Sequence, residues 1–361
     1  MGEIEHNKFM RRCLELASGA EGMTYPNPLV GSVVVYNGRI TGEGYHSKAG
    51  GPHAEVIAIN SVKDKSKLRE SALYVNLEPC SHFGKTPPCA DFIIANKIPR
   101  VVIGTIDTSD KVSGKGVARL KESGCDVLTG VLDHECRWLN RRFFTSNEKR
   151  RPWIILKWAQ SADGFLDIVR AENHVQKPTW ITGKPERVLV HKWRATEQAI
   201  LVGAGTIRAD NPRLNVREWK GNDPVKLILS RSGKIDNDIA ANETNGMVVV
   251  FSQSEESEIS GSVKVRLESD APASEQVLQY LNREGMQSLF IEGGAEVLNH
   301  FLSEGLWDEA RIFTGKGYFR EGLEAPAVKG INISRTNFAG SFLEVFLNEC
   351  NKALITIDNI N

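Results

Sequence analysis

The sequence predicts an α/β protein built from two domains. The chain has 361 residues, and at about 150 residues per domain this length favours two or three domains. Short apolar runs alternate with amphipathic helical patterns in both halves, which is typical of a sheet with helices on its faces. A basic, proline-ended segment separates the two halves.

The first half contains the patterns of two helices, a hairpin and three further strands. Residues 8–20 carry apolar positions at helical spacing, and residues 53–60 open a second helix. Residues 29–45 predict a hairpin, because a β-branched run ends at Asn37-Gly38, a dipeptide favoured in type I′ turns. Buried strands are predicted at 71–78, 100–107 and 124–130.

Residues 137–152 differ from both halves, because six of them are Lys or Arg and the stretch ends at Pro152. We place the domain boundary here and expect domains at residues 1–147 and 148–361. The simplest interpretation of the basic residues is a solvated joint. A contact with phosphate or RNA is the alternative.

The second half repeats the alternation of strands and helices. Ser274 is a plausible N-cap for one of its helices. The predicted helices cover residues 186–197, 274–285 and 295–306. The predicted strands cover residues 153–164, 199–205, 225–230, 247–252, 288–294 and 344–357.

Composition narrows the class of protein. Lys plus Arg equals Asp plus Glu, 45 each, which argues weakly against a broad nucleic-acid surface. The N-terminus lacks the apolar core of a signal peptide, and no run of 18 apolar residues predicts a membrane span. Six cysteines in such a chain do not suggest a disulfide framework. We therefore expect a cytoplasmic protein that does not bind membranes.

A zinc site is predicted in the first domain from His53, Cys80 and Cys89. One imidazole and two thiolates form a familiar zinc ligand set that leaves one position open for water. Glu55 is then available as an acid/base that does not bind the metal. Zinc deaminases use His-x-Glu followed by Pro-Cys-x-x-Cys, although here eight residues separate the two cysteines.

The spacing of His53 and Glu55 sets a geometric condition. Helix positions two apart lie on different faces, so both side chains must project from the open N-terminal end of the helix. Pro52 at or near the first helical position would fix that geometry. Zinc lowers the pKa of its water toward about 7, Glu55 passes the proton to the leaving amine, and the reaction is a hydrolytic deamination.

The second domain has no G-x-G-x-x-G motif, so a Rossmann dinucleotide fold is not indicated. Instead, glycines follow the apolar runs at 199–205 and 288–294 and precede helical sequence. Backbone N–H groups at such places can hold phosphate.

Several motifs resemble the bifunctional riboflavin-biosynthesis deaminase/reductase family over roughly residues 7–320. In the first half they are TYPNPLVG, GPHAEV and EPCSHFGKTPPC, and in the second LKWAQSADG, WITG, HKWRA, ILVGAGTIRADNPRLNVR and IEGGAEV. The resemblance implies a cytidine-deaminase-like α/β/α domain followed by a dihydrofolate-reductase-like α/β domain. It also implies that Asn27, Lys85 and Thr86 help to hold the deaminase substrate.

For the second domain the resemblance implies an NADPH site and a substrate site. The residues expected to contact NADPH are Ala159, Trp180, Thr206, Asp210, Gly293 and Gly294. Those expected to contact the ribose-phosphate substrate are Arg194, Leu214, Arg217 and Glu292. Pro178 stands where many family members have a serine, so the resemblance supplies no side-chain contact to the substrate at this position. No motif is recognised in the last 40 or so residues of the chain.

The activity implied by the resemblance has two steps and a small phosphorylated pyrimidine as substrate. Zinc-dependent hydrolysis removes the 2-amino group of 2,5-diamino-6-ribosylamino-4(3H)-pyrimidinone 5′-phosphate. NADPH then reduces the ribosyl group to a ribityl chain, giving 5-amino-6-ribitylamino-uracil 5′-phosphate. We expect a homo-oligomer that binds no nucleic acid.

Two other functions are compatible with parts of the pattern. An RNA adenosine deaminase shares the zinc residues, but it predicts a shorter cysteine spacing and leaves the second domain unexplained. A structural zinc module attached to a nucleotide-binding domain predicts four protein ligands, whereas only three are evident.

Overall fold

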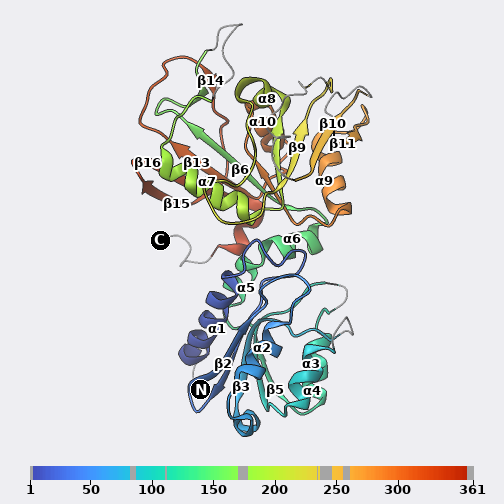
Figure 1. The fold of residues 1–361 in the computed structure, drawn as a ribbon. Coiled ribbons are helices and arrows are strands. Elements are labelled where there is room, and N and C mark those ends of the chain that lie inside the picture. The colour runs from blue at the N-terminus through green and yellow to red at the C-terminus, as the bar shows by residue number, and fades with distance from the viewer. Residues whose placement is uncertain are drawn as a thin grey trace. The chain divides into compact units, whose positions relative to one another are not determined.

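The computed structural model describes residues 3–81, 87–109, 112–169, 178–233, 235, 246–254 and 261–355. The chain divides into two compact units, Met1–Arg150 and Arg151–Asn361 (Figure 1). Among the described residues, every helix is too short or too polar to cross a membrane.

The first unit is built on a five-stranded sheet in the order β2-β1-β3-β4-β5. Its first two strands form the predicted hairpin, and Asn37 and Gly38 have φ values of 46° and 71°, as a type I′ turn requires. The β1–β3 pair is antiparallel, while β3, β4 and β5 run parallel. The strands are β1 Gly31–Tyr36, β2 Arg39–Tyr45, β3 Ala72–Leu77, β4 Arg100–Thr105 and β5 Asp126–Thr129.

Helices cover both faces of this sheet and make three layers. One core joins α1 and α5 to alternate strand residues such as Val33 and Tyr74. The other joins α2, α3 and α4 to the residues between them, such as Val34 and Val75. This alternation follows from the two-residue period of a strand. The helices are α1 Glu3–Ser18, α2 Ala54–Ser61, α3 Cys89–Ala95, α4 Lys115–Glu122, α5 Asp133–Leu139 and α6 Arg141–Lys149, with the short 3₁₀ helix η1 at Lys65–Glu70.

The interpretation of residues 137–152 as a solvated joint is wrong for much of the segment. Most of it is helical, within α5 and α6. Arg141 and Arg142 are buried, where Arg141 stacks on Trp138 at 4.3 Å and Arg142 pairs with Glu21. The guanidinium groups are buried because a carboxylate and an aromatic face replace the water that they lose.

The second unit is built on a nine-stranded sheet in the order β11-β10-β9-β8-β12-β6-β13-β16-β15, among the described residues. The strands from β11 to β13 run parallel to one another, and β16 and β15 add antiparallel strands at one end. They are β6 Trp153–Gln160, β8 Ala199–Gly203, β9 Val225–Leu229, β10 Val248–Ser252, β11 Val263–Arg266, β12 Ser288–Ile291, β13 Glu309–Thr314, β15 Ile331–Phe338 and β16 Ser341–Leu347.

Helices α9 Ala273–Arg283 and α10 Ala295–Ser303 pack on one face of this sheet, in a core with Leu156, Leu201 and Ile291. Helix α7 Lys184–Thr196 lies on the other face, where Trp193 contacts Phe290 and Phe313. The remaining elements are α8 Ala204–Asp210, the small antiparallel pair β7 Phe165–Asp167 and β14 Leu323–Glu324, and the 3₁₀ helix η2 Glu349–Leu354.

Two local expectations were wrong in this unit. Ser274 is not an N-cap, because Pro272 occupies that position and Ser274 is buried inside α9. The strand predicted at 344–357 ends at Leu347, and the 3₁₀ helix η2 follows. Asn348 causes this change, because its side chain accepts a hydrogen bond from the backbone N–H of Cys350 and caps the new helix.

Candidate functional site

The first candidate site lies at the N-terminus of α2. His53 is the N-cap residue, with an extended backbone, and Glu55 is the second helical residue. Both side chains therefore leave the open end of the helix, as the spacing required. Pro52 directly precedes the N-cap, so it stands near the first helical residue, Ala54, and not at that position.

His53, Cys80 and Cys89 come together in the geometry of a zinc site. Their ligand atoms all lie within 4.8 Å of one another. His53 Nδ1 is 3.1 Å from Cys89 Sγ and 3.6 Å from Cys80 Sγ. Tetrahedral zinc with Zn–S of about 2.3 Å and Zn–N of about 2.0 Å separates such atoms by about 3.6 Å. The donor set and its spacing therefore fit zinc, with three ligands among the described residues and one coordination position left for water.

Glu55 is buried at 3% exposure, and its Oε2 atom has no hydrogen-bond partner among the described residues. Burial raises the pKa of Glu55 to about 7, and a zinc cation beside it would lower that value. A buried, unpartnered carboxylate oxygen beside the three ligands is suited to exchanging protons with a bound molecule.

Glu78, to which the sequence motifs assigned no role, fixes the segment that carries Cys80. Its buried carboxylate accepts four backbone hydrogen bonds, and two of the N–H donors, those of Gly116 and Val117, belong to the first turn of α4. A Cβ atom at Gly116 would lie 2.1 Å from the Pro79 carbonyl oxygen, so only glycine fits there. The sequence contained a signal for this structural role, because Glu78 is an acidic residue at the end of a buried strand, directly before Pro79-Cys80.

Of the residues expected to hold the deaminase substrate, only Asn27 lies in the described part of the chain. Asn27 Nδ2 donates to His46 Nε2 at 3.0 Å, and His46 Nδ1 donates to the Pro52 carbonyl at 3.0 Å. The His46 ring meets the His53 ring edge-on at 5.7 Å, so Asn27 borders the metal ligands. Lys85 and Thr86 lie outside the described residues.

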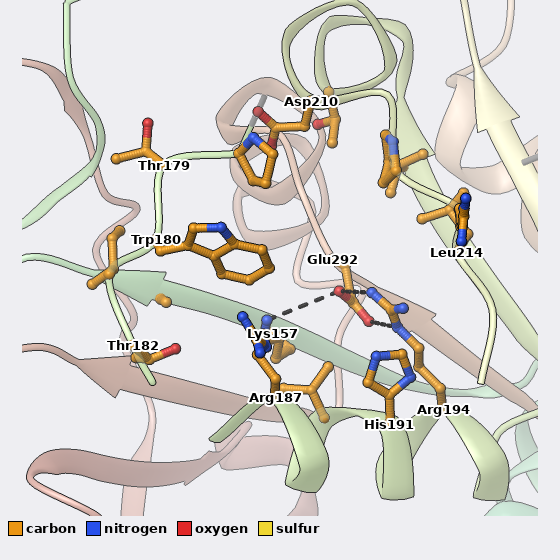
Figure 2. A pocket seen from close by; sticks show the side chains of 18 of the residues that line it. Lys157, Thr179, Trp180, Thr182, Arg187, His191, Arg194, Asp210, Leu214 and Glu292 are labelled. Atoms are coloured by element: carbon orange, nitrogen blue, oxygen red, sulfur yellow. Dashed lines mark hydrogen bonds and ion pairs between the residues drawn. The ribbon is translucent and has the colours of Figure 1, made fainter. Parts of the chain in front are cut away.

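The second candidate site is a cavity of about 450 Å³ in the second unit (Figure 2). It opens at the carboxyl ends of the parallel strands β6, β8 and β12, where α/β proteins commonly bind ligands. Four residues expected to contact substrate line it, namely Arg194, Leu214, Arg217 and Glu292. Four expected to contact NADPH also line it, namely Ala159, Trp180, Thr206 and Asp210.

Gly293 and Gly294 lie beside this cavity. Cβ atoms built at these glycines would lie 3.8 and 3.2 Å from Thr206 Oγ1. The φ value of Gly293 is +124°, which side chains rarely tolerate. The Gly293 carbonyl accepts from the Gly203 backbone N–H at 3.1 Å, which joins the strand ends that precede α8 and α10. Pro178 also lines the cavity.

A buried ion pair occupies the wall of the cavity. Arg194 donates from Nε and Nη2 to the two carboxylate oxygens of Glu292 at 2.6 and 2.8 Å. Burial alone would raise the pKa of Glu292, but Arg194 and Lys157 lower it to about 2. Lys157 Nζ lies 3.9 Å from Glu292 Oε2, and Figure 2 shows Lys157 on the side of this carboxylate opposite Arg194. Glu292 is therefore ionised and held in one orientation.

Lys157, Arg187 and His191 also line the cavity, and the sequence left them without a role. A role for Lys157 in the site could have been predicted from the sequence, because a lysine inside the apolar strand 153–160 is unusual unless it faces a charged partner. Arg187 stacks on Trp180 at 4.5 Å. Lys157 and Arg187, together with Arg194 and Arg217, give the cavity an excess of positive charge.

Comparisons with known proteins identify the domain that contains each site. Residues 3–105 match the family model described as "Cytidine and deoxycytidylate deaminase zinc-binding region", and residues 152–315 match the "RibD C-terminal domain". The riboflavin biosynthesis protein RibD of Aquifex aeolicus is 39% identical over 326 residues, which cover 89% of each chain. That of Bacillus amyloliquefaciens is 37% identical over 84% of this chain and 83% of its own.

A solved structure from Thermotoga maritima extends the agreement to the fold. It is described as a diaminohydroxyphosphoribosylaminopyrimidine deaminase/5-amino-6-(5-phosphoribosylamino)uracil reductase, and it superposes with a TM-score of 0.87 at 37% identity. The match covers 96% of this chain and 99% of that one. The chain therefore belongs to the RibD family of riboflavin biosynthesis proteins, with a zinc-binding deaminase domain followed by a reductase domain.

Proposed function

We propose that the first unit hydrolyses the 2-amino group from 2,5-diamino-6-ribosylamino-4(3H)-pyrimidinone 5′-phosphate, and that the second reduces the ribosyl group of the product with NADPH. The relatives' names support the pair of reactions. The observation that carries the first step is the meeting of His53, Cys80 and Cys89 beside an unpartnered Glu55 oxygen.

In the deaminase step, His53, Cys80 and Cys89 hold zinc, which when bound makes a water molecule acidic enough to act as a nucleophile near neutral pH. Glu55 Oε2 would take a proton from the attacking water and pass it to the departing amino group. One water is consumed and one ammonia is released. Asn27, Lys85 and Thr86 orient the substrate, and Glu78 keeps the Cys80 segment in place.

In the reductase step, NADPH supplies the hydride, and the chain positions the two reactants. Ala159, Trp180, Thr206, Asp210 and the Gly293-Gly294 pair hold the cofactor. Arg194, Leu214, Arg217 and Glu292 hold the ribose phosphate.

Arg194 can serve both its carboxylate partner and a ligand. An arginine has five N–H donors, and three of those of Arg194 bind Glu292 and the Asn215 carbonyl oxygen. Two N–H groups of this guanidinium therefore stay available for an anion.

The proposal also includes the substrate class, the cellular location and the oligomeric state of the enzyme. The substrate is a small phosphorylated pyrimidine, not a nucleic acid, and the enzyme acts as a cytoplasmic homo-oligomer. Analytical ultracentrifugation of the purified chain measures the oligomeric state directly.

Product analysis by mass spectrometry tests the proposed function. The purified chain is incubated with the diaminopyrimidine substrate, with and without NADPH. Without NADPH we expect the deaminated ribosyl compound, which is about 1 Da heavier because an oxygen replaces an N–H group. With NADPH we expect a further gain of two hydrogen atoms. Unchanged substrate in both reactions would refute the proposal.

A further inference from the structure

His191 is a buried histidine in the wall of the reductase cavity whose role is unassigned. It lies on α7 one turn before Arg194, so the two side chains share a face of the helix. Figure 2 shows both side chains rising from α7 toward Glu292. The HKWRA motif contains both residues, and only the arginine has a proposed contact.

The hydrogen bonding of His191 determines which ring nitrogen carries the proton. The backbone N–H of Arg217 donates to His191 Nδ1 at 3.3 Å. A nitrogen that accepts a hydrogen bond carries no proton, so the imidazole is neutral and protonated at Nε2. Burial, followed by the charges of Arg194 and Arg217, lowers the pKa of His191 to about 4. The ring therefore stays neutral at physiological pH.

The Nε2–H group of His191 has no acceptor among the described residues. It belongs to the lining of a cavity that is rich in donors, since Lys157, Arg187 and Arg217 also line it. A ligand of this cavity must therefore supply acceptor atoms. Of the two parts of the substrate, the phosphate supplies the larger number of acceptors and the matching negative charge.

The position of His191 beside Arg217 also favours the phosphate as the group that His191 binds. Arg217 is exposed, and its side chain donates from Nη1 to Asn215 Oδ1 at 3.1 Å. Burial and the neighbouring Arg194, Arg213 and Arg187 lower the pKa of Arg217, although Glu218 opposes this. The cations thus already repel one another. A neutral donor adds a hydrogen bond to an anion without adding to that repulsion.

We propose that His191 is a substrate-binding residue whose Nε2–H donates to a phosphate oxygen of the reductase substrate, beside Arg217. The proposal rests on the proposed function for the identity of the substrate. It assigns His191 to recognition of the phosphate and gives it no part in the hydride transfer.

Two substitutions test the roles of the two ring nitrogens of His191 separately. In His191→Asn, the side-chain oxygen can replace Nδ1 as acceptor for the Arg217 N–H, but nothing replaces the Nε2 donor. In His191→Gln, the amide N–H₂ can reach the position of Nε2. Lys192→Gln is the matched control, because Lys192 is the exposed neighbour on α7 and does not line the cavity.

The assay compares reductase kinetics on the phosphorylated substrate and on its dephosphorylated counterpart. A hydrogen bond to a charged group is worth about 10- to 150-fold in affinity. We therefore expect His191→Asn to raise KM for the phosphorylated substrate by about that factor and to leave KM for the dephosphorylated one unchanged. His191→Gln should recover most of the loss. Lys192→Gln and the KM for NADPH should not change.

Two results would overturn the proposal. An equal loss on both substrates would show that His191 contacts another part of the substrate or only supports the fold. An unchanged KM would show no contact. If His191→Asn does not fold, a crystal structure of the unaltered protein with ribose 5-phosphate decides, since a phosphate oxygen must lie within about 3.2 Å of Nε2.

Calorimetric binding of ribose 5-phosphate separates this proposal from the proposed function. Suppose that the unaltered protein does not turn over the pyrimidine substrate, but binds ribose 5-phosphate more tightly than His191→Asn does. The proposed function then fails and the phosphate site stands. If turnover is normal and ribose 5-phosphate binding is insensitive to His191→Asn, the phosphate site fails alone.

Discussion

The Arg194–Glu292 pair offers a quantitative test of how the reductase cavity is stabilised. Both side chains are about nine-tenths buried, at 10% and 9% exposure, and two hydrogen bonds join them. The pKa of Glu292 falls from 4.5 to about 2, which corresponds to about 3 kcal/mol of stabilisation at neutral pH. Arg194→Met removes the guanidinium, keeps most of the stem, and leaves a buried carboxylate with only Lys157 nearby. Breaking a buried pair in this way costs about 3–5 kcal/mol.

The measurement is urea unfolding followed by tryptophan fluorescence. Six of the seven tryptophans lie between residues 153 and 307, so this signal reports mainly on the second unit. We compare Arg194→Met, Glu292→Gln and the double variant. Because the two side chains interact directly, the double variant should lose less than the sum of the single losses by about 1–3 kcal/mol. Additive losses, or a loss below about 1 kcal/mol for Arg194→Met, would refute the reasoning.

The sign of the pH dependence follows from the same pair. The pKa of Glu292 is lower in the folded chain than the ordinary value of 4.5. Its contribution to stability is therefore present above pH 4.5 and is lost as pH falls toward about 2. Removing Arg194 should make the free energy of unfolding less dependent on pH within that window.

Four further outcomes are expected. Cys80→Ser should lose zinc and deamination together, measured by elemental analysis and ammonia release, because serine is a poor zinc ligand. Glu55→Gln should retain zinc but deaminate about 10²–10⁴-fold more slowly, and near-normal turnover would remove Glu55 from the mechanism. Glu78→Gln should weaken zinc affinity by about 10–100-fold in a chelator competition, whereas the exposed Glu70→Gln should not. Separation of the chain near Arg150 should yield a deaminase that needs no NADPH and a reductase that needs no zinc, and soluble but inactive fragments would contradict this.

Features that depend on neighbouring residues could be predicted from the sequence. The hairpin follows from Asn37-Gly38, because few other dipeptides adopt both positive φ angles. The zinc ligands follow from their residue types, since His and Cys in that order have few other joint uses. Ser274 shows the limit of local reasoning. It has the chemistry of an N-cap, but α9 begins before it and buries it near Glu304.

Features that depend on distant residues could not be predicted. The partners of Glu78 lie 29 to 39 positions further along the chain, and Arg194 and Glu292 lie 98 positions apart. No local pattern specifies which cation meets which carboxylate. The strands β15 and β16 carry no motif, yet they extend the second sheet, because β16 pairs with β13 and β15 pairs with β16.

Three buried glutamates show why the environment, not the residue type, assigns the role. Glu78 has both oxygens bound by backbone N–H groups, so it can only hold structure. Glu292 is fixed by Arg194, which lowers its pKa to about 2, so it remains an anion that orients its neighbours. Of these three glutamates, Glu55 is the one with a buried oxygen that has no partner among the described residues.

An unpartnered buried oxygen costs about 1–3 kcal/mol. Folding alone gives no reason to retain that cost at Glu55, while the backbone donors beside Glu78 show that this domain can satisfy a buried carboxylate. The hydrogen-bond partner that Glu55 Oε2 lacks is therefore a ligand that binds reversibly. In the second unit, His191 Nε2–H is a donor that lines the cavity and has no acceptor among the described residues, so the ligand expected there carries acceptors. At both sites, the neighbouring residues supply the reason to expect a ligand: the zinc ligands lie beside Glu55, and cationic side chains line the cavity with His191.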